Sequence, residues 1–260
     1  MFRTLPPFGG DQRQVSEVVR GLMDGKSNNT GSITLATGGA TTTTLDDRRI
    51  SADSVILFAP ASAAAFADYS PYGAFQDGTD QTVANTTTAY PITFDTTDFS
   101  NGVTLSNSSR LNVKVAGLYN IQFSIQLKNT TNDSQDADIW FRKNGTDIAA
   151  SNSRFGLAQR KASGDPYHLI GAMNFYVDLA ANDYIQLMWR ASDVGVVIEH
   201  YVAGTSPTRP ATPSVIATVN LVSLAASTNI YASSQGQGTA TITHFANSTA
   251  SKTYKYVVIG

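Results

Sequence analysis

The chain has 260 residues, enough for one large domain or two ordinary ones. Charged residues make up 15% of it, whereas about 25% is usual for a soluble domain. The formal net charge of -2 at pH 7 gives no electrostatic basis for binding nucleic acid or an anionic membrane. The chain contains no cysteine, which excludes disulfides and thiolate metal sites.

No apolar run approaches the roughly 20 residues that a membrane-spanning helix needs, so we expect no membrane insertion. Residues 1–8 lack the basic region and the apolar core of a signal peptide. We therefore expect a product that is made in the cytoplasm and leaves it only when the cell lyses.

The first predicted element is a helix, with Asp11 as its cap and with Gly21 and Gly25 ending it. Its apolar residues recur at helical spacing: Val15, Val18, Val19 and Leu22. Everything after the helix is predicted to form short strands between clusters of Gly, Asn, Asp and Thr. The strands are expected at 33–35, 42–45, 54–58, 92–94, 111–115, 119–127, 139–141, 170–177, 184–189, 194–201, 215–222, 239–243 and 254–259. Many short strands with turn signals between them indicate an all-β sandwich or barrel.

The clearest of these strands lies at 119–127, where apolar residues occupy every second position. That period is typical of a strand with one face on a core. Together with the preceding Gly117, the run resembles the G-x-Y-x-(I/F)-x-F strand of the jelly-roll superfamily that includes tumour necrosis factor and the complement globular head.

Three further segments continue this resemblance. Residues 140–148 look like a hairpin that turns through Asn144 and Gly145, the dipeptide best suited to a tight turn. Residues 175–187 resemble the F-x-V-x-L-x-x-G-D-x-I-x-L hairpin of the superfamily, with Asn182 in place of its glycine. Residues 214–222 look like the closing strand, which lies beside the first. The resemblance implies a jelly-roll β-sandwich that assembles as a homotrimer.

A surplus of apolar residues in the strands at 170–177 and 184–189 is compatible with assembly. Met173 beside Phe175, and Met188 beside Trp189, suggest apolar side chains on both faces of a sheet that needs only one for its own core. We expect neighbouring subunits to cover that surplus, in an interface on the order of 2,000 Å² or more.

The two ends of the chain resemble a small module of tailed-bacteriophage structural proteins. In the first part, the matching residues are Asp24, Gly25, Lys26, Asn28, Thr30, Gly31, Thr34, Leu35, Asp47, Arg49, Ile50, Ser54, Ile56, Pro60, Ala63 and Ala64. In the second, they are Gly238, Thr241, Thr243, His244, Asn247, Thr253, Tyr256, Val258, Ile259 and Gly260. The predicted organisation is therefore a discontinuous base module, residues 1–67 plus 226–260, that anchors the protein, with a jelly roll, residues 68–225, inserted between its halves.

No motif for catalysis, a cofactor or a metal stands out. None of the three histidines, His168, His200 and His244, has a second ligand at metal-site spacing. We expect His244 to make structural hydrogen bonds, His168 to lie exposed in a loop, and His200 to point away from the neighbouring Glu199. Residues 132–138 lack the central Gly and terminal Glu of a calcium loop, which favours an exposed polar loop. We expect a protein that is not an enzyme and carries no cofactor.

Two segments are candidates for contact with partners. Loops are expected at 128–138, 149–167 and 203–214, and the second mixes cations with aromatic residues, as recognition surfaces do. Its candidate distal recognition residues are Arg154, Phe155, Arg160, Lys161 and Tyr167. The candidate docking segment is Phe2, Arg3, Leu5 and Phe8, which could anchor to a neighbouring subunit or fold back on this chain's own core.

The resulting hypothesis is a non-enzymatic virion protein of a tailed bacteriophage, a trimeric head decoration, cement or head-fibre protein. Its partners would be two further copies and the major capsid protein or another virion protein. The alternative is a tail fibre or receptor-binding protein that recognises a host surface glycan or protein; the absence of a long repetitive shaft favours the head location. An enzyme that depolymerises surface polysaccharide, and a cytokine-like signal, are disfavoured.

Overall fold

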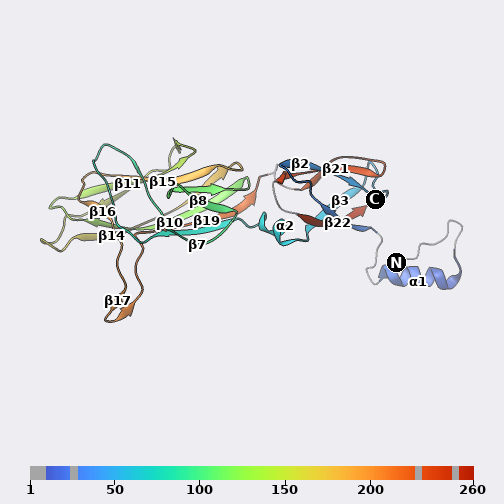
Figure 1. The fold of residues 1–260 in the computed structure, drawn as a ribbon, viewed down its shortest axis with the longest axis horizontal. Helices are drawn as coiled ribbons and strands as arrows, with labels where there is room; N and C mark the ends of the chain where they lie inside the picture. Colours follow the sequence, from blue (N-terminus) through green and yellow to red (C-terminus); the bar gives the residue numbers. More distant parts are fainter. Residues whose placement is uncertain (1–9, 24–28, 226–229, 248–251) are drawn as a thin grey trace. The chain divides into compact units, whose positions relative to one another are not determined.

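The structure is a computed structural model that describes residues 10–23, 29–225, 230–247 and 252–260. Strands account for 57% of the chain and helices for 7%, which confirms the all-β fold class. The chain forms two compact units: a base unit of residues 1–66 with 229–260, and a jelly-roll unit of residues 67–228 (Figure 1). The sequence predicted the divisions at residues 67 and 226.

Two helices are present in the described residues. α1 (Gln12–Met23) begins as predicted, because the Asp11 side chain accepts a hydrogen bond from the Gln14 N–H at 2.8 Å. The prediction that Gly21 ends this helix is wrong: Gly21 lies inside it, in open space, where a glycine costs only about 1 kcal/mol. The short α2 (Ala63–Ala67) was not predicted.

The base unit consists of two three-stranded antiparallel sheets. One has the order β1 (Thr30–Thr34), β22 (Thr253–Ile259), β3 (Val55–Pro60), and the other β2 (Ala40–Asp46), β21 (Thr239–Asn247), β20 (Tyr231–Gly236). In each sheet a strand from the end of the chain lies against at least one strand from its beginning. The base unit is therefore built jointly by segments that the jelly roll separates in sequence.

A partly buried ion pair and the tyrosine bonded to it join these segments. The Asp47 carboxylate accepts hydrogen bonds from the Arg49 guanidinium and, at 2.7 Å, from the Tyr256 hydroxyl. Arg49 also donates to the Thr30 carbonyl. The Tyr256 ring lies directly over Gly31, where any Cβ would stand 2.2 Å from a ring carbon. These residues of the phage-like pattern thus form one contact between β1, the segment after β2, and β22.

His244 and Asn247 make a second set of polar contacts in the base unit. His244 is 1% exposed; its Nδ1 lies 2.8 Å from the Phe245 carbonyl and its Nε2 lies 2.8 Å from the Thr43 hydroxyl. Because a carbonyl can only accept, Nδ1 donates to it, and Nε2 shares a hydrogen bond with the Thr43 hydroxyl. Asn247 donates to the carbonyls of Leu35 and Ala36. The predicted structural role of His244 is confirmed.

The jelly-roll unit is a sandwich of two antiparallel sheets. The first contains, in order, β14 (Tyr167–Leu179), β10 (Gly117–Asn129), β19 (Val215–Leu224), β4 (Tyr72–Asp77) and β7 (Thr96–Asn101), with β16 (Val196–Ile198) and β5 (Gln81–Thr82) beside the end of β10. The second contains β13 (Ser153–Leu157), β11 (Gln135–Lys143), β15 (Tyr184–Ala191), β9 (Arg110–Val113) and β8 (Val103–Ser106), with β12 (Thr146–Asp147) on β11 and β6 (Tyr90–Pro91) on β15. The small hairpin of β17 (Gly204–Thr205) and β18 (Thr208–Arg209) projects from the sandwich (Figure 1).

The strand order is that of a jelly roll. From β9 onward the chain passes from one sheet to the other repeatedly, and the last strand, β19, pairs with the first, β4, through Val215↔Asp77 to Asn220↔Tyr72. Because these two strands are antiparallel neighbours, the unit begins close to where it ends. Such a unit can be inserted into another domain without separating that domain's halves.

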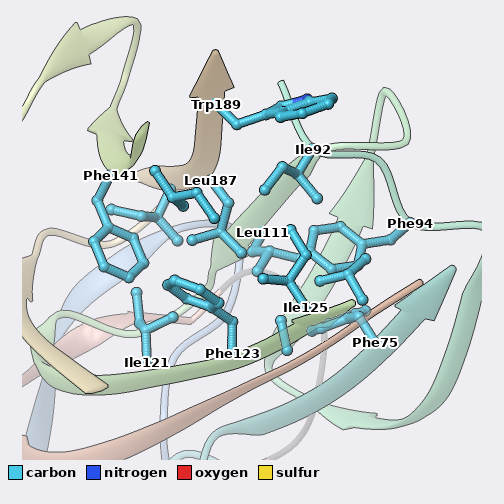
Figure 2. Close-up of a cluster of buried hydrophobic side chains, with 14 of the residues drawn as sticks. Phe75, Ile92, Phe94, Leu111, Ile121, Phe123, Ile125, Phe141, Leu187 and Trp189 are labelled. Carbon is cyan, nitrogen blue, oxygen red and sulfur yellow. The ribbon is translucent and has the colours of Figure 1, made fainter. Parts of the chain in front are cut away.

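The core of the sandwich is an apolar cluster from both sheets, shown in Figure 2. Phe123 of β10 meets Phe141 of β11 edge-on at 6.1 Å between ring centroids, and Phe141 stacks on Phe175 of β14 at 4.9 Å. Tyr119 is fully buried and its hydroxyl donates to the Val115 carbonyl at 2.7 Å. Burial raises the pKa of this hydroxyl well above its usual value.

Predicted turns and strands are correct where the local pattern is strong. Asn144 and Gly145 have φ values of 48° and 84°, and Asn182 has a φ of 69°, as the turn interpretation requires. The prediction of a continuous strand at 194–201 is wrong, since only β16 is regular there. β7, β8, β13 and β20 were not predicted; β7 exposes nearly every side chain, so it shows no alternation.

Candidate interaction surface

The most distinctive surface of the jelly-roll unit is the outer face of its first sheet. Strand register places its side chains in three rows across β14, β10, β19 and β4. The rows are Tyr176, Asn120, Asn220 and Tyr72; Asn174, Gln122, Thr218 and Ala74; and Ala172, Ser124, Ile216 and Gln76. With Ile170 and Phe99 at its margins, we call this set the neutral face.

The neutral face exposes several large apolar side chains. Phe99 is 65% exposed, Ile170 64% and Tyr176 54%, and Tyr72 and Ile216 are also largely exposed. The side chains between them are amides, hydroxyls and alanines, which can hydrogen-bond across an interface or pack against it. Several exposed apolar side chains on one sheet face make this face a candidate contact surface.

Charged groups lie only at the margins of the neutral face. Asp178 stands at one end of β14 and Lys128 at the far end of β10, and Asp98 accepts a hydrogen bond from Gln76 at 2.7 Å. None of the residues within the three rows carries a charge at neutral pH. A partner could therefore cover the face without burying an unpaired charge, which would be costly.

A cluster of paired charges, the strand-end cluster, lies where β10, β14 and β16 end. Glu199 stands between Lys128, whose Nζ is 2.6 Å from it, and His168, whose Nδ1 is 3.1 Å from it. The Tyr201 hydroxyl lies 2.8 Å from His168 Nδ1. Burial and the nearby Glu199 carboxylate raise the pKa of Tyr201 to about 12. The prediction that His168 lies in a loop is wrong, because it belongs to β14.

His200 belongs to a separate pair in the same region. Its Nδ1 lies 2.7 Å from Asp80, and its backbone N–H donates to the same carboxylate at 2.9 Å. Burial alone would raise the pKa of Asp80, but these two hydrogen bonds outweigh it and the pKa is lowered. His200 and Glu199 therefore have different partners, as expected if their side chains point apart.

The predicted distal recognition residues are not gathered into one surface. Residues 149–167 are not a single loop, since β13 runs through them. Phe155 and Tyr167 pack against the core, Arg154 pairs with Asp138 at 2.8 Å, and Arg160 donates to Asn132 at 2.8 Å. In the described residues, only the Lys161 side chain among the five is exposed without a polar partner. Their role in recognition stays a prediction.

The predicted docking segment, Phe2, Arg3, Leu5 and Phe8, lies outside the described residues. In the described part of the chain, no group of three histidine or acidic residues is arranged to hold a metal ion. No helix there is long and apolar enough to cross a membrane. Asp138 of the segment considered as a calcium loop is instead buried between two arginines.

The predicted surplus of apolar residues is present in the strand at 170–177 but not in the one at 184–189, and it does not lie at the residues singled out. Met173 and Phe175 lie two residues apart in β14, so both turn toward the core. Met188, on the opposite face from Trp189, is 2% exposed and is covered within the chain itself. On the neutral face, the exposed apolar side chains of β14 and β19 are Ile170, Tyr176 and Ile216. They could have been predicted from the residues that alternate with the core-facing ones in 170–177 and 215–222.

No protein-family model matches this chain, and no curated protein matches it.

Proposed function

We propose that this chain is a structural protein of a tailed-bacteriophage particle, assembled as a homotrimer through the neutral face of the jelly-roll unit. The base unit attaches the trimer to the major capsid protein or another virion protein. The proposed location is the head, where the protein serves as a decoration, cement or head-fibre protein. It performs no catalysis.

The neutral face carries this proposal. The three rows on four strands about 4.8 Å apart, spanning about six residues at a rise of about 3.3 Å, cover roughly 400 Å². That area is of the same order as the about 800 Å² per partner of a standard protein interface. Exposed apolar side chains without charges between them favour a permanent contact over a transient one.

The base unit supports the attachment role. Asp47, Arg49, Tyr256 and Gly31, which belong to the phage-like pattern, all take part in one partly buried contact. The pattern therefore describes residues that determine the shape of the base unit. A small unit of fixed shape, built from both ends of the chain, suits anchoring. The inserted jelly roll provides the assembly surface.

Native mass measurement of the recombinant protein tests the assembly. We expect a species at three times 27.7 kDa. Tyr176→Asp places a charge in the neutral face at a position that is 54% exposed, so the fold should persist while the trimer dissociates. The matched control is Val202→Asp, 72% exposed and outside the neutral face, which should leave the mass unchanged. A monomeric parent protein, or an unchanged trimer in Tyr176→Asp, would refute assembly through this face.

Imaging of particles that lack the gene tests the location. Loss of density on the head, with infectivity retained, is the expected result. Loss of adsorption to the host with an intact head would instead favour the receptor-binding alternative. Particles unchanged in composition would refute the structural role.

A further inference from the structure

The second sheet of the jelly-roll unit carries a pocket on its outer face, on the opposite side of the sandwich from the neutral face. Its volume is about 320 Å³, at the lower end of the range for small-molecule sites. The residues that line it and matter here are Asp138, Trp140, Asp147, Ile148, Asn152 and Arg190. Two carboxylates, a guanidinium, an amide and an indole thus meet in one hollow.

Strand register explains why these residues meet. In β11, the core-facing Ala137, Ile139 and Phe141 are buried, so Asp138 and Trp140 point to the outer face. Asp138 lies opposite Arg190 of β15. The tight turn at Asn144 and Gly145 then returns the chain so that Asp147 lies opposite Arg142.

Asp147 holds the indole of Trp140 in place. Its Oδ1 accepts the Trp140 Nε1–H at 2.7 Å and the Arg142 Nε–H at 2.6 Å. Its Oδ2 accepts one longer hydrogen bond from Arg142, at 3.2 Å. A carboxylate oxygen can accept two hydrogen bonds, and the Asp147 side chain is 53% exposed. Asp147 therefore keeps an acceptor position for a ligand beside the fixed ring of Trp140.

Asp138 holds the guanidinium of Arg190, a hydrogen-bond donor, on the other side of the pocket. Its side chain is only 5% exposed, and it pairs with Arg190 at 2.7 Å and with Arg154 at 2.8 Å. Arg190 remains 39% exposed and uses one N–H group in this pair, which leaves further donors. Asn152 adds an exposed amide that makes no hydrogen bond in the described part of the chain.

We propose that this pocket binds one neutral sugar residue, free or as part of a surface polysaccharide. The C–H face of a sugar ring can lie against the electron-rich face of Trp140. Its hydroxyl groups can donate to Asp147 and accept from Arg190 and Asn152. Around the pocket, three carboxylates are matched by three guanidinium groups, so it offers no net excess of either charge to select an ionic ligand: Asp136, Asp138 and Asp147 against Arg142, Arg154 and Arg190.

The arrangement supports binding and not hydrolysis of the sugar. Hydrolysis needs one carboxyl that stays protonated as a general acid. The hydrogen bond from Arg142 lowers the pKa of Asp147. Burial would raise the pKa of Asp138, but the hydrogen bond from Arg154 and the charge of Arg190 outweigh it and lower that pKa too. Both groups are therefore ionised at neutral pH.

The pocket does not depend on the proposed assembly. It faces away from the neutral face, so it stays open whether or not that face is covered. A failure to bind sugar would leave the trimer unaffected, and a monomeric protein could still bind sugar. The two proposals can therefore be refuted separately.

Nitrogen–proton correlation NMR of the full chain tests the pocket. The protein has two tryptophans, and Trp189 is buried in the core, so its indole N–H is an internal control. The probes are glucose, galactose, mannose and N-acetylglucosamine, each titrated to about 100 mM, because a single sugar is expected to bind with a Kd on the order of 1 to 10 mM. We expect at least one of them to shift the Trp140 resonance saturably and to leave that of Trp189 in place.

Matched variants complete the test. Asn152→Ala removes an exposed donor without touching the pairs that hold the strands, and should raise the Kd about five- to tenfold. Asn174→Ala, on the neutral face, should leave the Kd unchanged. The proposal is overturned if no neutral sugar shifts Trp140, if Trp189 shifts equally, or if Asn152→Ala binds like the parent. Binding of glucuronate alone would overturn the assignment to neutral sugars.

Discussion

The jelly-roll unit and the base unit are both antiparallel β structures that bury apolar and polar side chains, but the base unit is smaller and is built from both ends of the chain. In the jelly-roll unit, aromatic rings from the two sheets meet in one apolar cluster, among them Phe123 and Phe141 (Figure 2). In the base unit, polar side chains join the early and late segments: Tyr256 donates to Asp47, His244 bonds with Thr43, and Asn247 donates to the carbonyls of Leu35 and Ala36.

The small size of the base unit and the separation of its strands in sequence explain why these polar contacts matter there. A small unit buries a smaller share of its surface, so its apolar core alone contributes less to stability. It must also join segments that the inserted jelly-roll unit separates in sequence. Directional polar contacts, such as those of Asp47 with Arg49 and Tyr256, specify which strands pair and in which register. The comparison predicts that the jelly roll responds most to lost apolar volume and the base unit to lost polar contacts.

The largest expected effect is in the jelly-roll core. Phe75→Ala removes a fully buried ring that lies 6.2 Å from that of Phe94, and should lower the free energy of unfolding of this unit by about 3 to 5 kcal/mol. The matched control is Phe99→Ala on the neighbouring strand, 65% exposed, for which we expect less than about 1 kcal/mol in monomeric protein. Urea unfolding should show only the jelly-roll transition moving; equal losses in the two variants would contradict the assignment of the core.

Asp47→Asn should have the next largest effect, on the base unit. The side chain is 7% exposed, and the substitution leaves Arg49 without its charge partner, so we expect a loss of roughly 2 to 4 kcal/mol at pH 7. Asp46→Asn is the matched control, since Asp46 is exposed. Urea unfolding monitored by proteolysis of residues 230–260 separates this transition from that of the jelly roll. A loss of the same size in both variants would show that the ion pair is not the cause.

The stability from Asp47 should depend on pH. The hydrogen bond from Arg49 outweighs the effect of burial and lowers the pKa of this carboxyl well below its ordinary value of 3.8. A group whose pKa is lower in the folded state stabilises that state fully above its unfolded pKa. This contribution is then lost as the pH falls below about 4 toward the folded pKa. The difference between the parent and Asp47→Asn should therefore shrink on acidification, and a constant difference from pH 7 to pH 2 would contradict the linkage.

Local sequence signals predicted those parts of the fold that a local physical cause determines. The alternation at 119–127 identified β10 because every inward side chain reaches the core. Asn144 and Gly145 identified a hairpin because few other residues adopt positive φ at both positions. In contrast, β20 has no apolar alternation, since it is an edge strand whose register depends on β21.

The candidate sites could not be predicted in this way, because each depends on register between distant strands. Trp140 and Arg190 line one pocket only because β11 pairs with β15, which places Asp138 opposite Arg190. The neutral face likewise requires four strands in register before Tyr176 and Tyr72 lie in one row. One sequence specifies such pairing through the whole core and not through any short motif.

Gly145→Ala tests the turn that positions Asp147 and should have a smaller effect. Gly145 has a φ of 84°, a conformation that alanine adopts only with strain, so we expect a loss of about 1 to 2 kcal/mol in the jelly-roll unit. Gly156→Ala is the control, because Gly156 lies in β13 without positive φ, and the nearest atom to an added Cβ is 3.7 Å away. Thermal unfolding followed by near-ultraviolet circular dichroism measures both. An unchanged midpoint in Gly145→Ala would contradict the turn geometry.

The smallest expected effect is that of Tyr256→Phe, which removes one hydroxyl and keeps the ring that lies over Gly31. The Tyr256 hydroxyl donates to Asp47 at 2.7 Å, so its loss should lower the stability of the base unit by about 1 kcal/mol. That hydrogen bond also helps to lower the pKa of Asp47, and its removal should move the acid transition of the base unit to slightly higher pH. Tyr231→Phe, at a position 45% exposed, is the control and should change neither quantity. A stability loss without any shift of the acid transition would show that Tyr256 acts through packing and not through the carboxylate.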